Sequence, residues 1–490
     1  MKKKTIAILL FACLTAMLLS ACANNDVSRQ GDDIPGITAE SNENDYIAAE
    51  PESSHWDILG ERSFNGRTFT ILDANDNPAM WHNVPTEELT GEAINDALIN
   101  RNIFIEDTFD IVLEYVQIVG HGNGTNRLRQ SIHAGEDRYD MIIGRVMGGE
   151  MATLATGGFL QNLADMPYLS LESPWWSRLM YQNLQFDGNL FFTMGDIVPS
   201  MYQAPSAMFF NRQMLLDYGH EDNLYELVFE GRWTIDVLER LTRDVDQDLT
   251  GDGRLHSATD IFGILVQGLT TTSDQIATSA GIRLATVRDG EITVEFNTQA
   301  VAERIYRLGE IYRRTPWNSH QNELIDITFH EGRGMFLPHF LEAGILQLRD
   351  MEQDYGILPM PKFDEQQESY ISFINGWNCA FVGMPLNADQ SRAAFIMEAK
   401  AYASYNTVRP QVYDVVLHHR AARDEESARI IDMIIETSYL DLNAIYNWGG
   451  STDVLSRAMF DGQPLISNFE AREGAIQAAI ENFIDAMRGE

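Results

Sequence analysis

The sequence has 490 residues, of which 72 are Asp or Glu and 35 are Lys or Arg, giving a formal net charge of −37 at pH 7. Apolar residues make up 44% of the chain, which excludes a disordered or collagen-like protein, and three cysteines exclude a disulfide scaffold. This length predicts two or three domains. Because nucleic acids are bound by cations that neutralise phosphates, we expect no nucleic-acid partner for so acidic a chain.

The N-terminus has the features of a secretory signal peptide over residues 1–21. Three lysines precede an uncharged apolar run over residues 6–19, which is shorter than the about 20 residues that span a bilayer. The run ends in Leu19-Ser20-Ala21-Cys22, which resembles a bacterial lipoprotein signal. The resemblance implies that Cys22 becomes the lipidated, palmitate-bearing first residue of a protein anchored to the outer face of the cytoplasmic membrane. The alternative is an ordinary cleaved signal with an incidental cysteine.

The residues after the signal predict a disordered tether over 22–61, since they are polar and acidic and offer little apolar surface to bury.

The cysteine count agrees with this organisation. Cys13 leaves with the signal and Cys22 carries lipid, so Cys379 has no partner for an intramolecular disulfide. Its apolar surroundings at residues 377–382 predict a buried thiol.

From residue 62 onward, short β-like runs alternate with amphipathic helices, which is typical of α/β proteins. The first part predicts a βαβαβ unit, and parallel sheets bind ligands at the carboxyl ends of their strands, which favours the loops after Asp73 and Ile143. Helices dominate from residue 388 to the end. The strands of the βαβαβ unit are 69–73, 111–116 and 139–143, and further strands are predicted at 187–193, 207–210, near 335, 355–358 and 374–382. The predicted helices include 94–105, 126–134, 211–244 and 298–313.

Several local sequences then resemble a known family in their order and spacing. They are Met208-Phe209-Phe210-Asn211-Arg212-Gln213-Met214, Trp233-Thr234, Phe329-His330-Glu331-Gly332-Arg333-Gly334-Met335-Phe336, Tyr355-Gly356-Ile357-Leu358-Pro359-Met360-Pro361 and the strand with Trp377. From about Phe64 to Glu490 the chain resembles the extracellular solute-binding proteins of ABC importers, specifically the sugar-binding family that includes the maltose-binding protein.

The resemblance implies two lobes, each a mainly parallel sheet flanked by helices, which close about hinge strands on a ligand in the cleft. It places the N-terminal lobe at 62–198 and 326–377 and the C-terminal lobe at 199–325 and 378–490. It also implies a lipid-anchored monomer at the cell surface that needs no cofactor. Such a protein captures a carbohydrate or similar polar solute and delivers it to ABC permease subunits.

The candidate ligand-binding residues follow from the chemistry of sugars, which present apolar faces ringed by hydroxyl groups. Such ligands need flat aromatic side chains together with carboxylates, amides or Arg that form hydrogen bonds. For each tryptophan the alternative is core packing, and for each carboxylate it is a cap or turn. Trp175 and Trp176 are expected to pack, and no role is assigned to His339. The candidates are Asp73, Trp81, Arg145, Asp196, Trp377 and Trp448.

An acidic loop over residues 248–256 is a candidate Ca²⁺ site. Asp248, Thr250 and Asp252 supply oxygen donors at alternate positions, and Gly253 occupies the sixth position, where Ca²⁺ loops require a sharp turn. Thr259 stands where a bidentate Glu is expected. The loop therefore predicts either a weak structural Ca²⁺ site or a solvated acidic turn.

Signals for catalysis are few, and we expect a protein that is not an enzyme. The sequence has no Walker-type phosphate loop, no His-Glu-x-x-His, no Gly-x-Ser-x-Gly and no paired Cys motif. Two alternatives stay open. An acidic, aromatic-rich secreted chain is also compatible with a glycoside hydrolase that uses two carboxylates, and a binding protein can serve as the ligand-sensing subunit of a membrane receptor.

Overall fold

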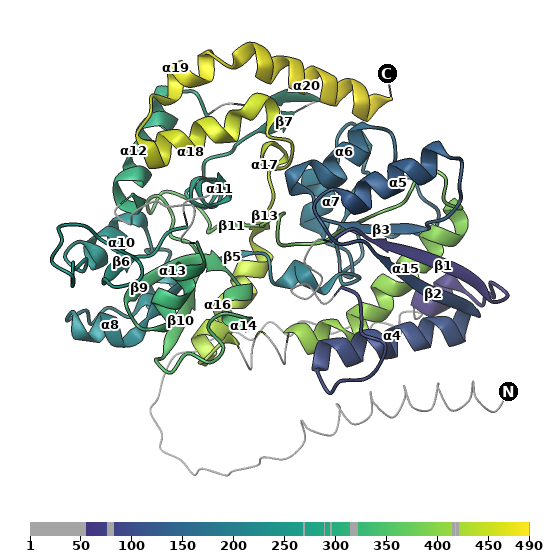
Figure 1. The fold of residues 1–490 in the computed structure, drawn as a ribbon, viewed down its shortest axis with the longest axis horizontal. Coiled ribbons are helices and arrows are strands. Elements are labelled where there is room, and N and C mark those ends of the chain that lie inside the picture. The colour runs from purple at the N-terminus through teal and green to yellow at the C-terminus, as the bar shows by residue number, and fades with distance from the viewer. Residues whose placement is uncertain are drawn as a thin grey trace, which may run out of the picture.

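The computed structural model describes residues 55–75, 83–267, 270–288, 290–294, 296–313, 322–413, 417 and 421–489, which form two α/β lobes around separate sheets (Figure 1). The two-lobed α/β architecture expected from the sequence is confirmed. The predicted signal peptide, Cys22, most of the predicted tether and Trp81 lie outside the described residues. In the described part of the chain, no helix is both long and apolar enough to cross a membrane.

The N-terminal lobe contains a five-stranded sheet in the order β2-β1-β3-β12-β4. Strands β1, β2 and β3 are parallel and form the predicted βαβαβ unit, whereas β12 is antiparallel to both β3 and β4. The last five residues of β1 are buried, as expected for a parallel strand covered on both faces. The strands are β1 (Arg67–Asp73), β2 (Ile111–Gln117), β3 (Met141–Gly144), β4 (Phe192–Thr193) and β12 (Phe381–Gly383), and the connecting helices are α4 (Ala93–Phe109) and α5 (Asn123–His133).

The C-terminal lobe contains a four-stranded sheet in the order β10-β5-β9-β6. Strand β9 is parallel to β6 but antiparallel to β5, and β10 is antiparallel to β5. The expectation of mainly parallel sheets is therefore wrong in this lobe, because β5 enters from the other lobe instead of through a helical crossover. The strands are β5 (Ser206–Asn211), β6 (Phe262–Ile264), β9 (Gly334–Phe340) and β10 (Tyr355–Leu358).

The chain passes between the sheets three times, and the predicted lobe boundaries need correction. The first passage, between β4 and β5, contains the expected lobe boundary at residues 198–199. The return expected near Asp326 is wrong, because β9 hydrogen-bonds to β5 and β6 and so keeps most of 326–377 in the C-terminal lobe. The start of 378–490 lies in the N-terminal lobe instead, since β12 pairs with β3 and α15 (Gln390–Thr407) packs on α4.

The strand predicted over residues 374–382 is split by the second passage. Its beginning borders β11 (Ser372–Phe373), which pairs with β13 (Ser438–Tyr439), and its end forms β12 in the other sheet. Between them Asn375 makes a turn, in which its side chain accepts a hydrogen bond from the Trp377 backbone N–H at 3.0 Å. Asn-Gly sequences favour turns, so Asn375-Gly376 breaks the extended run and leaves Trp377 on the connection between lobes.

The end of the predicted tether is folded. Residues His55–Leu59 form α2, and Trp56 packs against Phe104 and Tyr402. The His55 imidazole nitrogen Nε2 lies 2.9 Å from Oε1 of Glu398, which is fully buried. The tether prediction is therefore wrong for residues 55–59, because their aromatic side chains bury against the first lobe.

Trp175 and Trp176 are both buried, and their packing role is confirmed. Their indole N–H groups donate to Glu398 at 2.9 and 2.8 Å. Cys379 is also buried, as expected, and it is the free thiol of the described residues. Burial raises the pKa of this thiol, which keeps it protonated and unreactive.

The remaining elements cover the two sheets. In the N-terminal lobe they are η1 (Met147–Gly149), α6 (Glu150–Thr156) and α7 (Arg178–Leu184), and η2 (Pro199–Tyr202) lies on the first passage. Those that follow β5 are α8 (Arg212–Asp217), α9 (Leu224–Phe229), α10 (Ile235–Thr242), α11 (Thr270–Ser279), β7 (Thr286–Arg288), β8 (Glu291–Thr293), α12 (Gln299–Tyr312), α13 (Asn322–His330) and α14 (Glu342–Ile345). The last are α16 (Glu425–Glu436), α17 (Leu442–Tyr446), η4 (Trp448–Gly450), α18 (Ser451–Asp461), α19 (Leu465–Glu470) and α20 (Glu473–Arg488).

Candidate functional site

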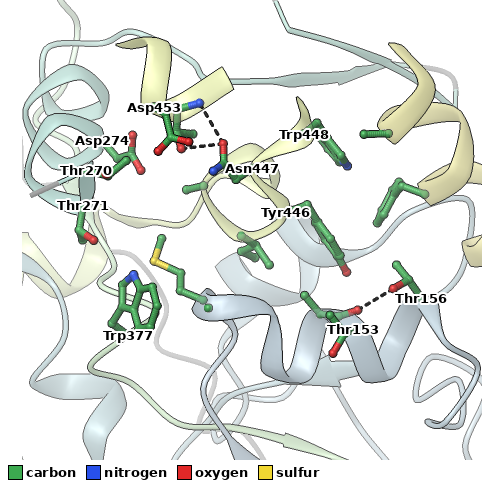
Figure 2. A pocket seen from close by; sticks show the side chains of 18 of the residues that line it. Thr153, Thr156, Thr270, Thr271, Asp274, Trp377, Tyr446, Asn447, Trp448 and Asp453 are labelled. Atoms are coloured by element: carbon green, nitrogen blue, oxygen red, sulfur yellow. Dashed lines mark hydrogen bonds between the residues drawn. The ribbon is translucent and has the colours of Figure 1, made fainter. Parts of the chain in front are cut away.

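A cavity of about 610 Å³ lies between the two lobes (Figure 2). The N-terminal lobe lines it with η1 and α6, and the C-terminal lobe lines it with α11, residues 444–453 and α20. A second cavity of about 380 Å³ shares Thr270, Thr271 and Trp377 with the first. Together these first and second chambers have the size of a small-molecule site, and Trp377 borders both.

Two parallel aromatic rings form one wall of the first chamber. Tyr446 and Trp448 stack with ring centroids 5.8 Å apart and an angle of 4° between their planes, and Phe483 packs against the edges of both. The intervening Asn447 has a left-handed backbone with φ of 43°, which asparagine tolerates, and this turn sets the two rings side by side. Figure 2 shows Asp274 on the opposite side of the cavity from this wall.

Trp377 forms a second aromatic surface, and its indole ring packs against Arg145 and Gly148. Its side chain is 38% exposed, and the Arg145 guanidinium carbon lies 4.9 Å from the ring centroid. Glu150 fixes Arg145 with Nε–Oε1 and Nη2–Oε1 distances of 3.2 and 3.0 Å. Gly148 approaches the indole so closely that a Cβ there would lie 2.7 Å from ring atoms. Arg145 therefore supports the indole and lines neither chamber.

Asp274 is the buried acidic group of the first chamber. Its side chain is 3% exposed, and its Oδ1 has no hydrogen-bond partner among the described residues. Burial raises its pKa well above the ordinary value, and the nearby Asp441 and Asp453 carboxylates act in the same direction. A buried acceptor without a partner is costly unless a ligand or water supplies the hydrogen bond, so Asp274 is placed to bind a donor.

The second chamber is also lined by polar groups. Glu342 is 1% exposed and accepts a hydrogen bond from the Asn378 side chain, while its Oε2 has no partner among the described residues. Burial, with a contribution from Asp326, raises the pKa of Glu342 to about 8. His339 Nε2 lies 3.5 Å from Asp326 Oδ1. His339 therefore belongs to this chamber, although no role was assigned to it from the sequence.

The structure brings together some of the predicted ligand-binding residues. Trp377 and Trp448 line the first chamber, and Arg145 lies behind Trp377. Asp73 lines neither chamber; it accepts hydrogen bonds from the Asn75 backbone at 3.1 Å and the Gln117 side chain at 2.9 Å, as the turn alternative expects. Trp81 lies outside the described residues.

Asp196 lies on the first passage between lobes and lines neither chamber. It is 1% exposed and accepts a hydrogen bond from the Tyr202 hydroxyl, while its Oδ2 has no partner among the described residues. Burial raises the pKa of Asp196 to about 7. It is therefore a buried carboxyl of the hinge region, and it does not contact either chamber.

The acidic loop forms hydrogen bonds with its own backbone. Asp248 accepts from the Gly251 and Gly253 backbone N–H groups, both at 2.7 Å, and Asp252 accepts from the Arg254 N–H at 2.9 Å. These bonds lower the pKa of both carboxyls. No group of three or more His, Cys, Asp or Glu side chains in the described residues is arranged to hold a metal ion, and Ca²⁺ binding by Asp248, Thr250 and Asp252 stays a prediction.

Sequence reasoning missed much of the polar lining, above all Asp274, Glu342 and Tyr446. The sequence of α11 offers one signal, because four consecutive residues, Thr272-Ser273-Asp274-Gln275, are polar. The structure shows that all four are buried. A polar helix next to predicted core segments indicates a lined cavity. Glu342 gives no such signal, because only the fold brings it beside Asn378.

Comparisons with known proteins identify the fold. No family model matches the chain, and no curated protein matches it. Among solved structures, a cyclo/maltodextrin-binding protein in complex with maltotetraose matches with a TM-score of 0.55 and 10% identity, over 85% of this chain and 96% of that chain. The chain therefore shares the two-lobed α/β fold of this cyclo/maltodextrin-binding protein.

Two further structures share this fold. The GacH receptor of Streptomyces glaucescens GLA.O, solved unliganded and with acarbose, matches with a TM-score of 0.51 and 14% identity over 86% of this chain and 98% of that one. An ABC substrate-binding protein from Listeria monocytogenes in complex with cycloalternan matches with a TM-score of 0.50 and 12% identity, over 86% and 99% of the two chains. All three neighbours were solved in complex with a carbohydrate or with acarbose.

Proposed function

We propose that this protein is the solute-binding component of an ABC importer and that it captures a carbohydrate between its lobes without chemical change. The observation that supports this best is the interlobe cavity, in which the Tyr446–Trp448 wall faces the unpaired carboxyl of Asp274. Stacking surfaces suit the apolar faces of sugar rings, and buried acceptors suit their hydroxyl groups. The carbohydrates bound by the neighbouring structures agree with this ligand class.

Closure of the lobes completes the site. Each lobe supplies only part of the lining, and the connections at residues 194–205 and 374–380 join two separately built sheets. A ligand that contacts both lobes stabilises the closed arrangement by its additional affinity for it. The closed form is then presented to the permease subunits, and Cys22 holds the protein at the outer face of the cytoplasmic membrane.

The test is a binding screen of the purified protein with mono- and oligosaccharides by calorimetry, together with small-angle scattering and chromatography of the sugars. We expect one sugar class to bind, a decrease in radius of gyration on binding, and full recovery of the intact sugar. Released products would favour the glycoside hydrolase instead. Binding by no sugar would overturn the carbohydrate assignment.

The membrane anchor is tested separately. We expect Cys22→Ala to move the protein from the membrane fraction to the soluble fraction, because the acylated residue is lost. Cys379→Ala is the matched control, since that thiol is buried and is expected to leave the protein in the membrane fraction. A C22A protein that stays membrane-bound would contradict lipidation. Loss of uptake in a strain without the neighbouring permease genes would separate import from receptor signalling.

A further inference from the structure

The ionisable groups that line both chambers are almost all acidic. Among the described lining residues, the carboxyl groups are Asp274 and Asp453 in the first chamber and Asp326 and Glu342 in the second, and no Lys or Arg lines either chamber. His339 is the single basic side chain of this lining. A neutral sugar needs acceptors and donors about equally, so this imbalance favours a ligand with additional donors.

The Arg145 guanidinium lies outside both chambers and does not offset these charges. Arg145 lies behind Trp377 and is held by Glu150, so its charge is matched on the far side of the indole. Asp441, which adjoins α11, accepts hydrogen bonds from the backbone N–H groups of Leu284 and Ala285 at 3.0 and 3.1 Å. Asp441 is thereby satisfied, whereas Asp274 is left with an acceptor that no described residue pairs.

Two of the acidic groups that line the chambers carry buried oxygen atoms without a hydrogen-bond partner among the described residues. Asp274 Oδ1 and Glu342 Oε2 both lie on side chains less than 5% exposed, and neither oxygen has a partner among the described residues. Charge-assisted hydrogen bonds are about twice as strong as neutral ones, so an ammonium group gains more here than a hydroxyl. Without a cation, burial and the surrounding carboxylates favour protonated Asp274, as the direction of its pKa shift indicates.

We propose that the site selects amine-bearing carbohydrates and that Asp274 binds the ammonium group of an amino sugar in the first chamber. The sugar ring of that residue packs against Tyr446, which the buried Trp448 supports, and Trp377 separates it from the next ring in the second chamber. Asp453 contributes to the negative potential, and Glu342 receives a donor from the second ring. This inference rests on the proposed carbohydrate-binding function and specifies its substrate class.

The test compares matched sugars that differ only in the acetylation of their nitrogen atoms. Glucosamine and its β-1,4-linked di- and trimers are measured against the N-acetylated sugars of the same length by calorimetry at pH 7, with glucose and maltose as neutral references. We expect the best amine-bearing sugar to bind at least about ten-fold more tightly than its acetylated form. Most of the preference should persist as salt is raised, because a pair formed on the buried Asp274 carboxyl is screened less than attraction to surface charges.

Variants locate the preference. We expect Asp274→Asn to bring the affinities for amine-bearing and acetylated sugars to within about two-fold of each other. Asp252→Asn, which removes one carboxylate from the acidic loop, should leave the preference for amine-bearing sugars intact. An equal loss in D252N would overturn the assignment to Asp274 and indicate the overall charge instead. Should D274N fail to fold, the salt dependence and the sugar pairs with the unaltered protein still decide.

The outcomes separate the two proposals. Neutral sugars that bind as tightly as their amine-bearing counterparts would overturn the amine preference and leave the carbohydrate function standing. Binding by no sugar of either kind would overturn both.

Discussion

The two lobes contribute different chemistry to the cavity between them. The C-terminal lobe supplies the aromatic wall and the buried carboxyl of Asp274, whereas η1 and α6 of the N-terminal lobe supply small and apolar side chains and two threonines. Those threonine hydroxyls are used within α6, because Thr153 donates to the Glu150 carbonyl and Thr156 to the Ala152 carbonyl. Under the proposed function, this difference predicts that the C-terminal lobe makes most of the polar and aromatic contacts with the ligand.

The largest effect is expected from the aromatic wall. Trp448→Ala removes a side chain that is 2% exposed and packed against Tyr446 and Phe483, so we expect unfolding to become easier by about 3–5 kcal/mol, with loss of sugar binding. Denaturant titration and calorimetry measure the two effects. Trp448→Phe is the control and should retain most of both. An unchanged unfolding free energy in W448A would contradict the packing described here.

The second largest effect is expected on the pH dependence of stability, through Asp196 on the connection between the lobes. The pKa of Asp196 rises from 3.8 to about 7, so the folded protein holds this proton after the unfolded chain has lost it. Its stabilisation is complete below about pH 4 and is lost as the pH rises through 7, an effect of about 2–4 kcal/mol.

The variant Asp196→Asn tests this assignment. Its unfolding free energy, measured by denaturant titration from pH 4 to 8, should decline less steeply with rising pH than that of the unaltered protein. Identical slopes would show that Asp196 is already ionised in the folded protein. Asp73→Asn is a useful comparison, because burial raises that pKa too but hydrogen bonds from Asn75 and Gln117 oppose the shift.

Trp377 lies on the connection between the lobes, so its substitution tests a part of the site that neither lobe supplies. It is 38% exposed, so Trp377→Ala should change stability little while it weakens sugar binding by about 1–2 kcal/mol, roughly five- to thirty-fold. Calorimetry with the best-binding sugar measures the loss, and Trp377→Phe should restore part of it. Unchanged affinity in W377A would remove the indole from the site.

The smallest effect is expected in the N-terminal lobe. Thr156→Ala removes a hydroxyl group that bonds within α6, so the affinity for sugar should change by less than about three-fold. The same calorimetric assay measures it, and Thr271→Ala on the opposite side is the matched comparison. If T156A lost more affinity for sugar than T271A, the prediction that the C-terminal lobe makes most of the ligand contacts would be wrong.

Much of the first lobe could be predicted because its signals are local. The apolar runs of β1 and β3 and the helical spacing in α4 depend only on neighbouring residues. The first lobe boundary came instead from the resemblance to solute-binding proteins. Trp377 was found by its position on the second passage. The assignment of β9 and β12 to lobes failed because every residue of both strands is buried, and nothing in either sequence specifies which sheet it joins.

The site was predicted less completely, for a related reason. Tryptophans attract attention as residue types, so the candidates included Trp448 and Trp377, which line the first chamber. An aspartate in a polar helix usually faces solvent, and only the packing of α11 against α18 buries Asp274. Asp73 was chosen for its place at a strand end, and local hydrogen bonds account for it without a ligand.

The position of β12 affects how the polypeptide reaches its native state. This late strand is inserted between β3 and β4, so the two earlier strands lack their shared neighbour until the chain through residue 383 is available. Pairings between distant parts of a sequence slow folding, because the intervening loop must close first. A nascent chain that ends before β12 therefore leaves two unpaired strand edges, and its first half acquires a complete sheet only after most of the second half has been made.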